Sequence, residues 1–96
     1  MGSTSDESKM SKAKETLEEF GIEYEWKVLS AHRNPDKVVN LVSTARENGF
    51  VAFICGAGMA AHLAGVVAAH TTLPVVGVPL SGGALNGQDA LYATVQ

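Results

Sequence analysis

The chain has 96 residues, a formal net charge of −3, and 46% hydrophobic against 18% charged residues. This length supports one domain rather than two, and the composition is that of a globular protein rather than a disordered one. Seven basic residues against ten acidic ones argue against a nucleic-acid-binding surface. The single cysteine, Cys55, excludes an intramolecular disulfide. Because it lies in an apolar run, we expect a small buried hydrophobe there.

The N-terminal residues are polar and lack the apolar core of a signal peptide. The apolar stretch over 51–80 is interrupted by glycines and Pro74, whereas a membrane span needs about 20 unbroken apolar residues. We therefore expect a soluble cytoplasmic protein that binds no membrane. Residues 48–88 carry no formal charge apart from histidines, which suggests burial from both sides by other elements or by other subunits.

Helical and strand patterns alternate along the first half of the chain. Residues 6–20 predict a helix, since apolar side chains recur there at helical spacing. Thr4 and Glu7 have the spacing of a capping box, and Gly21 supplies the stop. Residues 23–29 follow as a predicted strand, with apolar and charged side chains alternating. The apolar stripe of the helix consists of Met10, Ala13, Leu17 and Phe20.

A second helix is predicted with Asn34 as its N-cap, Pro35 at its first position and Asp36 at the positive end of its dipole, and Gly49 ends it. Residues 50–55 form a short continuous apolar run, which indicates a strand buried on both faces. The remaining predicted elements are a turn over 56–58, a helix over 59–70, a buried strand over 74–78, a glycine-rich loop over 79–87 and a helix over 89–96.

This alternation predicts an α/β fold with a parallel sheet and right-handed crossovers. We expect three layers, with helices on both faces of the sheet in a flavodoxin-like or Rossmann-like arrangement, and residues 1–96 as one domain. In such sheets the ligand crevice lies outside the carboxyl ends of the strands. Three loops are therefore expected to gather at one edge.

The first loop, residues 2–6, offers hydroxyls and amide groups at a helix N-terminus, which suit a phosphate. Asp6 could accept hydrogen bonds from sugar hydroxyls, although an ordinary N-cap has the same pattern. The second loop holds Ser30, His32 and Arg33. Arg33 can clamp a phosphate with two hydrogen bonds, and His32 can exchange a proton near neutral pH. The alternative is that His32 is a solvated or capping group.

The third loop, residues 56–62, has the form G-x-G-x-x-A of a dinucleotide-binding turn but lacks the acidic residue expected about 20 positions later. What remains is a pocket of small residues with one histidine, His62. A metal site is poorly supported, because the histidines have no carboxylate or thiol at ligand spacing. His70 is expected to be a C-terminal helix residue favoured by the dipole. No serine stands in a nucleophile elbow.

Taken together, five segments resemble N5-carboxyaminoimidazole ribonucleotide mutase, the PurE family of purine biosynthesis. The resemblance covers essentially the whole chain, in order and spacing. Its Ser-Ala-His-Arg and Gly-Ala-Gly-x-Ala-Ala-His forms are similar to the mutase branch rather than to the branch that carboxylates aminoimidazole ribonucleotide with free CO2. The segments are Met1–Asp6, Ser30–Asp36, Gly56–Leu63, Leu73–Pro79 and Asp89–Gln96.

The resemblance implies a homo-octameric enzyme without cofactor or metal that acts on aminoimidazole ribonucleotides. It implies that His32 shuttles protons, that His62 belongs to the catalytic group, and that Arg33 holds the phosphate. Ser3 and Asp6, with Ser5 nearby, would bind the phosphoribosyl part of the substrate. The other implied binding residues, several of which form the pocket that confines CO2, are Ser30, Ala31, Gly56, Ala57, Gly58, Ala61 and Leu63.

Met59 stands where the family usually has glycine, and Ala64 where it usually has proline. Met59 adds bulk beside the implied CO2 pocket, unless it points into the core. The family also has a buried strand before the first loop and further segments after the last, so we expect this chain to be a fragment of that pattern. Two other functions stay open: a carboxylase of the same fold that uses CO2, and an inactive flavodoxin-like module that binds a phosphorylated metabolite.

Overall fold

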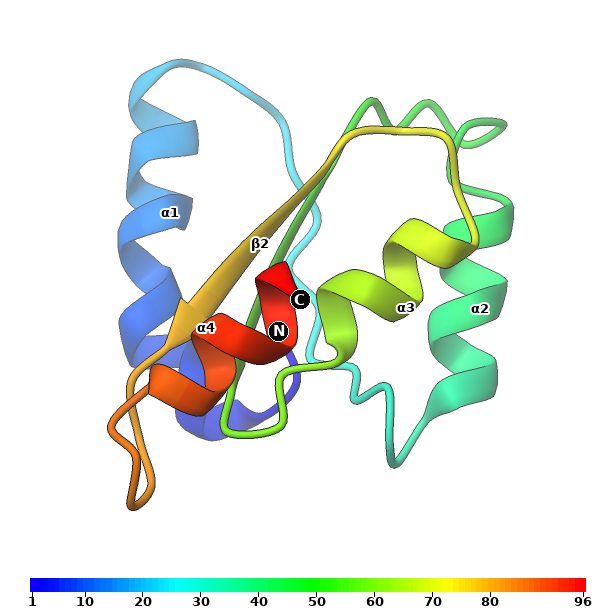
Figure 1. Cartoon of the computed structure of the whole chain (residues 1–96). Helices are drawn as coiled ribbons and strands as arrows, with labels where there is room; N and C mark the ends of the chain where they lie inside the picture. Colours follow the sequence, from blue (N-terminus) through cyan, green and yellow to red (C-terminus); the bar gives the residue numbers. More distant parts are fainter.

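The computed structural model describes all 96 residues and has seven helices and strands (Figure 1). None of the helices combines the length and the apolar character needed to cross a membrane. In chain order the elements are a 3-10 helix η1 (Thr4–Asp6), α1 (Glu7–Glu19), α2 (Pro35–Ser43), β1 (Phe53–Gly58), α3 (Leu63–Ala69), β2 (Val75–Leu80) and α4 (Gln88–Val95).

The sheet consists of β1 and β2, which run parallel with α3 as the crossover between them. Their register runs from Phe53 opposite Val75 to Gly58 opposite Leu80. Parallel strands need such a crossover because a tight hairpin turn can only join antiparallel ones. The predicted α/β class with a parallel sheet is confirmed.

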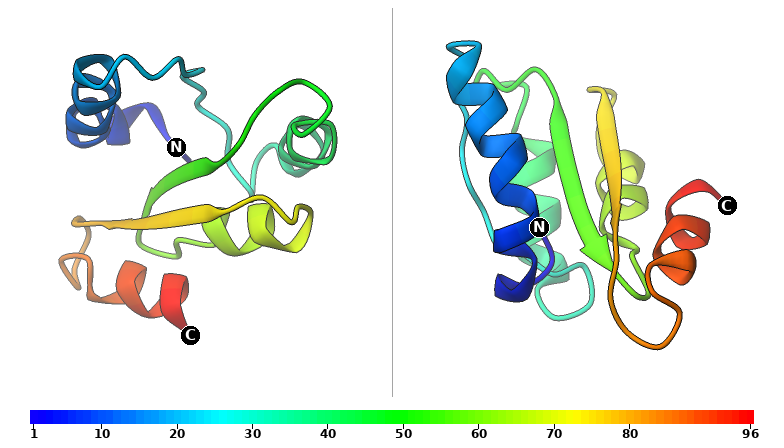
Figure 2. Two further views of the ribbon diagram at one scale, coloured as in Figure 1. Left: turned by 90° about the horizontal axis from the view of Figure 1, so that it is seen from above. Right: turned by 90° about the vertical axis from the view of Figure 1, so that its left-hand side faces the viewer.

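Two glycines show which helix covers which face of the sheet. A Cβ atom at Gly56 of β1 would lie 2.4 Å from Sδ of Met10, so α1 packs closely on that face. A Cβ atom at Gly77 of β2 would meet Thr94 of α4 and Ala64 of α3 on the opposite face. Figure 2 shows α1 on one side of the strands and α3 and α4 on the other. The helices therefore lie in two layers with the sheet between them.

The main core joins β1 to α2 and α3. Cys55, 6% exposed, packs there as the small buried hydrophobe that its apolar surroundings predict. Burial also raises the pKa of its thiol to about 11. The cluster consists of Val38, Val42, Cys55, Leu63 and Val67.

The prediction of a strand over residues 23–29 is wrong. These residues run beside the core as a connection without regular secondary structure, and their backbone pairs with the chain only at Met1. The Met1 amino group donates to the Lys27 carbonyl at 2.9 Å, and the Leu29 amide donates to the Met1 carbonyl at 2.8 Å. The alternation of side chains is real, but a strand also requires a neighbouring backbone along its length.

Several element bounds also differ from the prediction. Strand β1 begins at Phe53, three residues later than expected, and continues through the predicted turn at 56–58 because β2 pairs with it as far as Leu80. The predicted helix over 59–70 begins only at Leu63, since residues 59–62 form the loop. The first N-cap is Ser3, whose side chain accepts from the Ser5 amide, rather than Thr4.

The second helix begins at Pro35 as predicted, but the side chain of Asn34 does not cap it. Instead, Oδ1 of Asn34 accepts a hydrogen bond from the Ser30 amide at 3.4 Å. This helix ends at Ser43, and turns continue to Gly49, whose φ of 85° only glycine adopts readily.

Candidate functional site

The three predicted loops meet at the carboxyl ends of the strands. The amide of Gly2 donates to the carbonyl of Gly56 at 3.1 Å, which joins the first loop to β1. Nη2 of Arg33 donates to the carbonyl of Gly2 at 2.7 Å, which joins the second loop to the first. A pocket of about 150 Å³ opens between them. It is lined by Gly2, Ser3, Ser5, Asp6, Ala31, His32, Ala57, Gly58, Met59, Ala60, His62 and Leu63.

The second loop is held in shape by Ser30, which is 8% exposed. Its Oγ accepts hydrogen bonds from the amides of His32 at 3.2 Å and Arg33 at 3.1 Å. The Asn34 amide donates to the Ser30 carbonyl at 2.8 Å. Ser30 therefore lies behind the pocket and fixes where His32 and Arg33 point, rather than lining the pocket itself.

Two histidines from different loops meet at the mouth of the pocket. Nε2 of His32 lies 2.7 Å from Nδ1 of His62, and the rings are edge to face with centroids 4.9 Å apart. A hydrogen bond between two imidazoles requires that one nitrogen carry the proton and that the other be free to accept it. The pair can therefore hold and transfer a proton at an exposed position beside the pocket.

The first loop supplies polar groups to the same pocket. Oγ of Ser5 donates to Oγ of Ser3 at 3.0 Å, and Oγ of Ser3 also accepts from the Ser5 amide at 3.3 Å. Asp6 follows at the beginning of α1. Hydroxyls, a carboxylate and amide groups at a helix N-terminus are a polar arrangement suited to a sugar phosphate.

The third loop forms the apolar wall of the pocket. Ala57 and Gly58 at the end of β1 line it, whereas Ala61 is 2% exposed and lies beneath the surface. Gly56 is buried against Met10 and contributes its carbonyl to Gly2 rather than a surface to the pocket. Of the residues predicted for binding, Ser30, Gly56 and Ala61 thus support the pocket, and Arg33 borders the first loop outside it.

Met59 does not point into the core, because it is 59% exposed and lines the pocket. Its φ of 50° lies in the left-handed region, where glycine is favoured. A Cβ atom at Gly83 would lie 3.1 Å from Cγ of Met59, so the side chain extends toward the loop after β2. Nζ of Lys9 donates to the Ser81 carbonyl and ties that loop to α1.

Three residues in or beside the site carry no individual signal in the sequence: Gly2, Ala60 and Lys9. Gly2 and Ala60 line the pocket, and their membership of two loop motifs was the only signal for them. Lys9 lies on a helix, far in sequence from the loop that it contacts. The structure brings together no group of three or more His, Cys, Asp or Glu side chains that could hold a metal ion.

Comparison with known proteins identifies the family. A family model described as AIR carboxylase matches residues 1–96. The chain belongs to the AIR carboxylase family. Among curated proteins, N5-carboxyaminoimidazole ribonucleotide mutases of Vibrio vulnificus and Bacillus subtilis are each 54% identical over 96 residues. A phosphoribosylaminoimidazole carboxylase of Schizosaccharomyces pombe is 52% identical over the same length.

All three alignments cover 100% of this chain but only part of the relatives. The chain spans 60% of the Vibrio vulnificus protein, 59% of the Bacillus subtilis protein and 17% of the Schizosaccharomyces pombe protein. The predicted resemblance to the family is confirmed over the whole chain. The relatives that match the chain include proteins named as mutases and one named as a carboxylase.

Proposed function

We propose that this chain carries the site of an N5-carboxyaminoimidazole ribonucleotide mutase. Such an enzyme moves a carboxylate from the exocyclic nitrogen of the ribonucleotide to carbon 4 of the imidazole. The observation that carries the proposal is the 2.7 Å contact of His32 and His62 beside a pocket with a hydroxyl- and carboxylate-bearing side and an apolar side. The names of the mutases that are 54% identical support the same reaction.

The reaction needs one proton to change places. Cleavage of the C–N bond releases CO2, and its electron pair stays on the nitrogen. Carbon 4 then attacks CO2 to form the C–C bond and loses its proton, while the exocyclic nitrogen gains one. Because nothing is gained or lost overall, a base that accepts and returns a single proton suffices. His32, hydrogen-bonded to His62, is the residue proposed for this task.

The free CO2 must stay beside carbon 4 until it reacts. Ala57, Gly58 and Leu63 line the pocket and bring no polar side chain to it, so their side chains offer CO2 no competing hydrogen bonds. Holding both reactants in one pocket raises their effective concentration and excludes water. With a volume of about 150 Å³, the pocket suits a single imidazole ring and CO2 rather than a dinucleotide.

Ser3, Ser5 and Asp6 are proposed to hold the ribose and phosphate at the beginning of α1. Arg33 uses one nitrogen on the Gly2 carbonyl, and its remaining N–H groups are proposed to bind the phosphate. We further propose a cytoplasmic homo-octamer, a state that agrees with the uncharged stretch over residues 48–88 and its exposed apolar side chains.

A carboxylase that uses free CO2 is the second candidate, favoured by the name of the Schizosaccharomyces pombe relative. Dependence of the rate on added bicarbonate separates the two, because a mutase brings its own carboxylate. The test measures both reactions with the chain by ultraviolet absorbance. Conversion of the N-carboxylated substrate without bicarbonate supports the mutase, and conversion only of the uncarboxylated substrate with bicarbonate contradicts it.

A further inference from the structure

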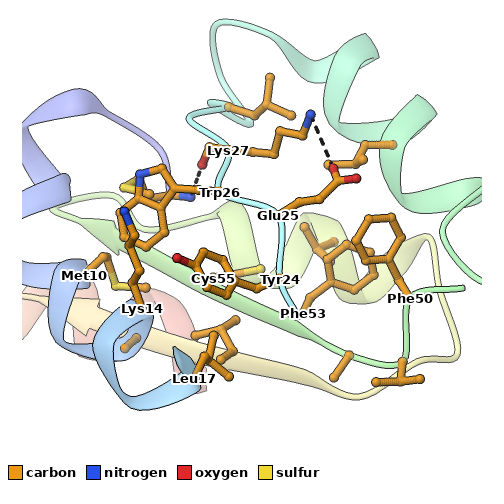
Figure 3. Close-up of a pocket in the computed structure, with 18 of the residues that line it drawn as sticks. Met10, Lys14, Leu17, Tyr24, Glu25, Trp26, Lys27, Phe50, Phe53 and Cys55 are labelled. Atoms are coloured by element: carbon orange, nitrogen blue, oxygen red, sulfur yellow. Dashed lines mark hydrogen bonds and ion pairs between the residues drawn. The ribbon is translucent and has the colours of Figure 1, made fainter. Parts of the chain in front are cut away.

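The methionines of the chain differ widely in exposure. Met10 is 5% exposed and its sulfur packs against Gly56, whereas Met59 is 59% exposed. Met1 is half-buried. Met1 and Met10 both line an apolar hollow of about 290 Å³ between α1, residues 22–29 and β1, where Figure 3 shows Met10. Met59 is therefore the thioether that an oxidant in solution meets most directly.

The only thiol of the chain, that of Cys55, is a poor competitor for such an oxidant. Its side chain is 6% exposed and belongs to the main core. Burial also raises the pKa of the thiol to about 11, and the thiolate rather than the thiol is the nucleophile that attacks an oxidant. Near neutral pH, oxidation should therefore begin at Met59 rather than at Cys55.

The backbone of Met59 is fixed at the edge of the candidate site. Its φ of 50° lies in the left-handed region, and strained residues of this kind concentrate at functional sites and switch regions. The Met59 carbonyl accepts from the Ala61 amide at 2.8 Å. The Ala60 carbonyl accepts from the amide of His62 at 2.9 Å, and His62 contacts His32. A change at Met59 therefore acts on the loop that holds the histidine pair.

The side chain of Met59 joins the pocket to the loop over residues 81–87, which we call the β2–α4 loop. A Cβ atom at Gly83 would lie 3.1 Å from Cγ and 3.2 Å from Sδ of Met59, so the sulfur lies against the backbone of this loop. On the side of α1, Nζ of Lys9 donates to the Ser81 carbonyl. An apolar contact and a hydrogen bond from two different elements thus hold the β2–α4 loop in place.

We propose that Met59 is a reversible oxidation site, converted by hydrogen peroxide to the sulfoxide, and that this change loosens the β2–α4 loop and makes the pocket wall polar. In the reaction the sulfur attacks one oxygen of the peroxide, the O–O bond breaks and an S–O bond forms. The sulfur is oxidised by two electrons. The other oxygen takes the proton of the transferred one and leaves as water.

The sulfoxide changes both contacts of Met59. It is polar where the thioether is apolar, so it no longer suits the dry contact with Gly83. Its oxygen also adds a hydrogen-bond acceptor to the pocket that His32 and His62 line. We therefore expect carboxylate migration to slow at least fivefold, an effect that rests on the proposed function. The oxidation site and the loosened loop do not depend on which reaction the site performs.

The test treats the chain with limiting hydrogen peroxide and follows each methionine by mass spectrometry. Trypsin separates the methionines, because no lysine or arginine follows Arg46 and Met59 is the only methionine of that last peptide. We expect Met59 to gain oxygen at least tenfold faster than Met10. In concentrated urea the two rates should become similar, since the selectivity comes from burial in the folded chain.

Oxidation should also lower the urea midpoint of the parent chain. Methionine sulfoxide reductases, which together reduce both epimers, should restore it. Met59→Leu is the matched control, because leucine keeps an apolar side chain of similar size without the sulfur. For this variant, the same dose of peroxide should leave both the urea midpoint and the rate of carboxylate migration as they are in its own untreated sample.

Three results would overturn the proposal. The first is oxidation of Met10 and Met59 at equal rates in buffer. The second is an unchanged urea midpoint for the Met59 sulfoxide, or an equal effect of peroxide on Met59→Leu. The third is an active parent whose turnover is the same before and after oxidation. An untreated parent without turnover would contradict the proposed function instead, and the oxidation rates and urea midpoints would still decide the present inference.

Discussion

Nε2 of His32 and Nδ1 of His62 lie 2.7 Å apart although 30 residues separate them in the sequence. The contact depends on two different supports. Ser30 fixes the loop before His32, and the loop over residues 59–62 holds His62 just ahead of α3. If His32 carries the transferred proton, His62 is the residue that selects which of its ring nitrogens is protonated.

Replacing His62 tests this positioning role. We expect His62→Asn to lower kcat by about 10–100-fold with little change in KM, because the proton carrier is misoriented while the binding groups remain. The pH dependence of kcat should also change. His70→Asn is the matched control, since the His70 side chain hydrogen-bonds to the Val66 carbonyl and lies at the end of α3. Unchanged kcat in His62→Asn would contradict the role.

Replacing Arg33 should affect binding more than turnover. Arg33→Ala removes the hydrogen bond to Gly2 and the proposed phosphate contact, so we expect substrate affinity to fall by about 1.5–3 kcal/mol in calorimetry. Arg33→Lys keeps the charge but not the planar fork and should recover only part of the loss. Arg46→Ala is the control, because Arg46 donates to Thr72 away from the site. Equal affinity in Arg33→Ala and Arg46→Ala would exclude the contact.

Gly56 should tolerate no side chain while Met10 is present. A Cβ atom there would lie 2.4 Å from Sδ of Met10, so Gly56→Ala is expected to lower the free energy of unfolding by about 1–3 kcal/mol in urea. The loss should shrink in a Met10→Ala background. Gly65→Ala, in α3 with open space around it, should instead stabilise by about 0.5–1 kcal/mol. A Gly56→Ala variant as stable as the parent would show that α1 does not pack on β1.

Met59→Gly should stabilise the chain. Met59 has a φ of 50°, which costs a residue with a side chain about 1–2 kcal/mol relative to glycine. The substitution also opens the pocket wall. Ala60→Gly at the next exposed position is the control and should not stabilise, because Ala60 has no positive φ to relieve. A lower urea midpoint for Met59→Gly would mean that its contact with the loop at Gly83 outweighs the backbone strain.

The buried thiol predicts a loss of stability at alkaline pH. Burial raises the pKa of Cys55 from 9.0 to about 11, so the unfolded chain releases this proton at lower pH than the folded one. The buried, protonated thiol therefore contributes to the free energy of unfolding, and this contribution is complete below pH 9 and lost as pH rises through 11. It amounts to about 2–3 kcal/mol. The difference between the parent and Cys55→Ala, measured by urea unfolding at each pH, isolates it. A constant difference would contradict the shift.

The sequence predicted the loops better than the elements between them. Gly21 placed the end of α1 and Pro35 the beginning of α2, because these signals are local. The predicted caps did less well, since Ser3 rather than Thr4 is the first N-cap and the side chain of Asn34 caps nothing. The apolar run around β1 could not fix its register, since Phe50 and Phe53 suit a strand equally well and only pairing with Val75 decides. Apolar and charged side chains alternate over residues 23–29 as in a strand. Whether these residues form a strand depends on a neighbouring backbone segment, which the alternation does not reveal.

The site was predictable for similar reasons. Parallel strands bring their carboxyl ends to one edge, so the meeting of the loops that hold Ser3, His32 and His62 followed from the order of elements. The contact between the two imidazoles did not, because side-chain direction depends on the exact bend of both loops. Nor did the supporting roles of Ser30 and Ala61, since composition cannot distinguish a residue that lines a pocket from one beneath it.

The central claim is that His32 transfers the proton in carboxylate migration. It is tested most directly by following interconversion of the N-carboxylated and C-carboxylated aminoimidazole ribonucleotides by ultraviolet absorbance, with the chain beside His32→Asn. Binding of substrate to both is measured in parallel by calorimetry. The account predicts turnover by the parent that vanishes in His32→Asn while binding persists. Near-normal turnover in His32→Asn, or binding without turnover in either protein, would contradict it.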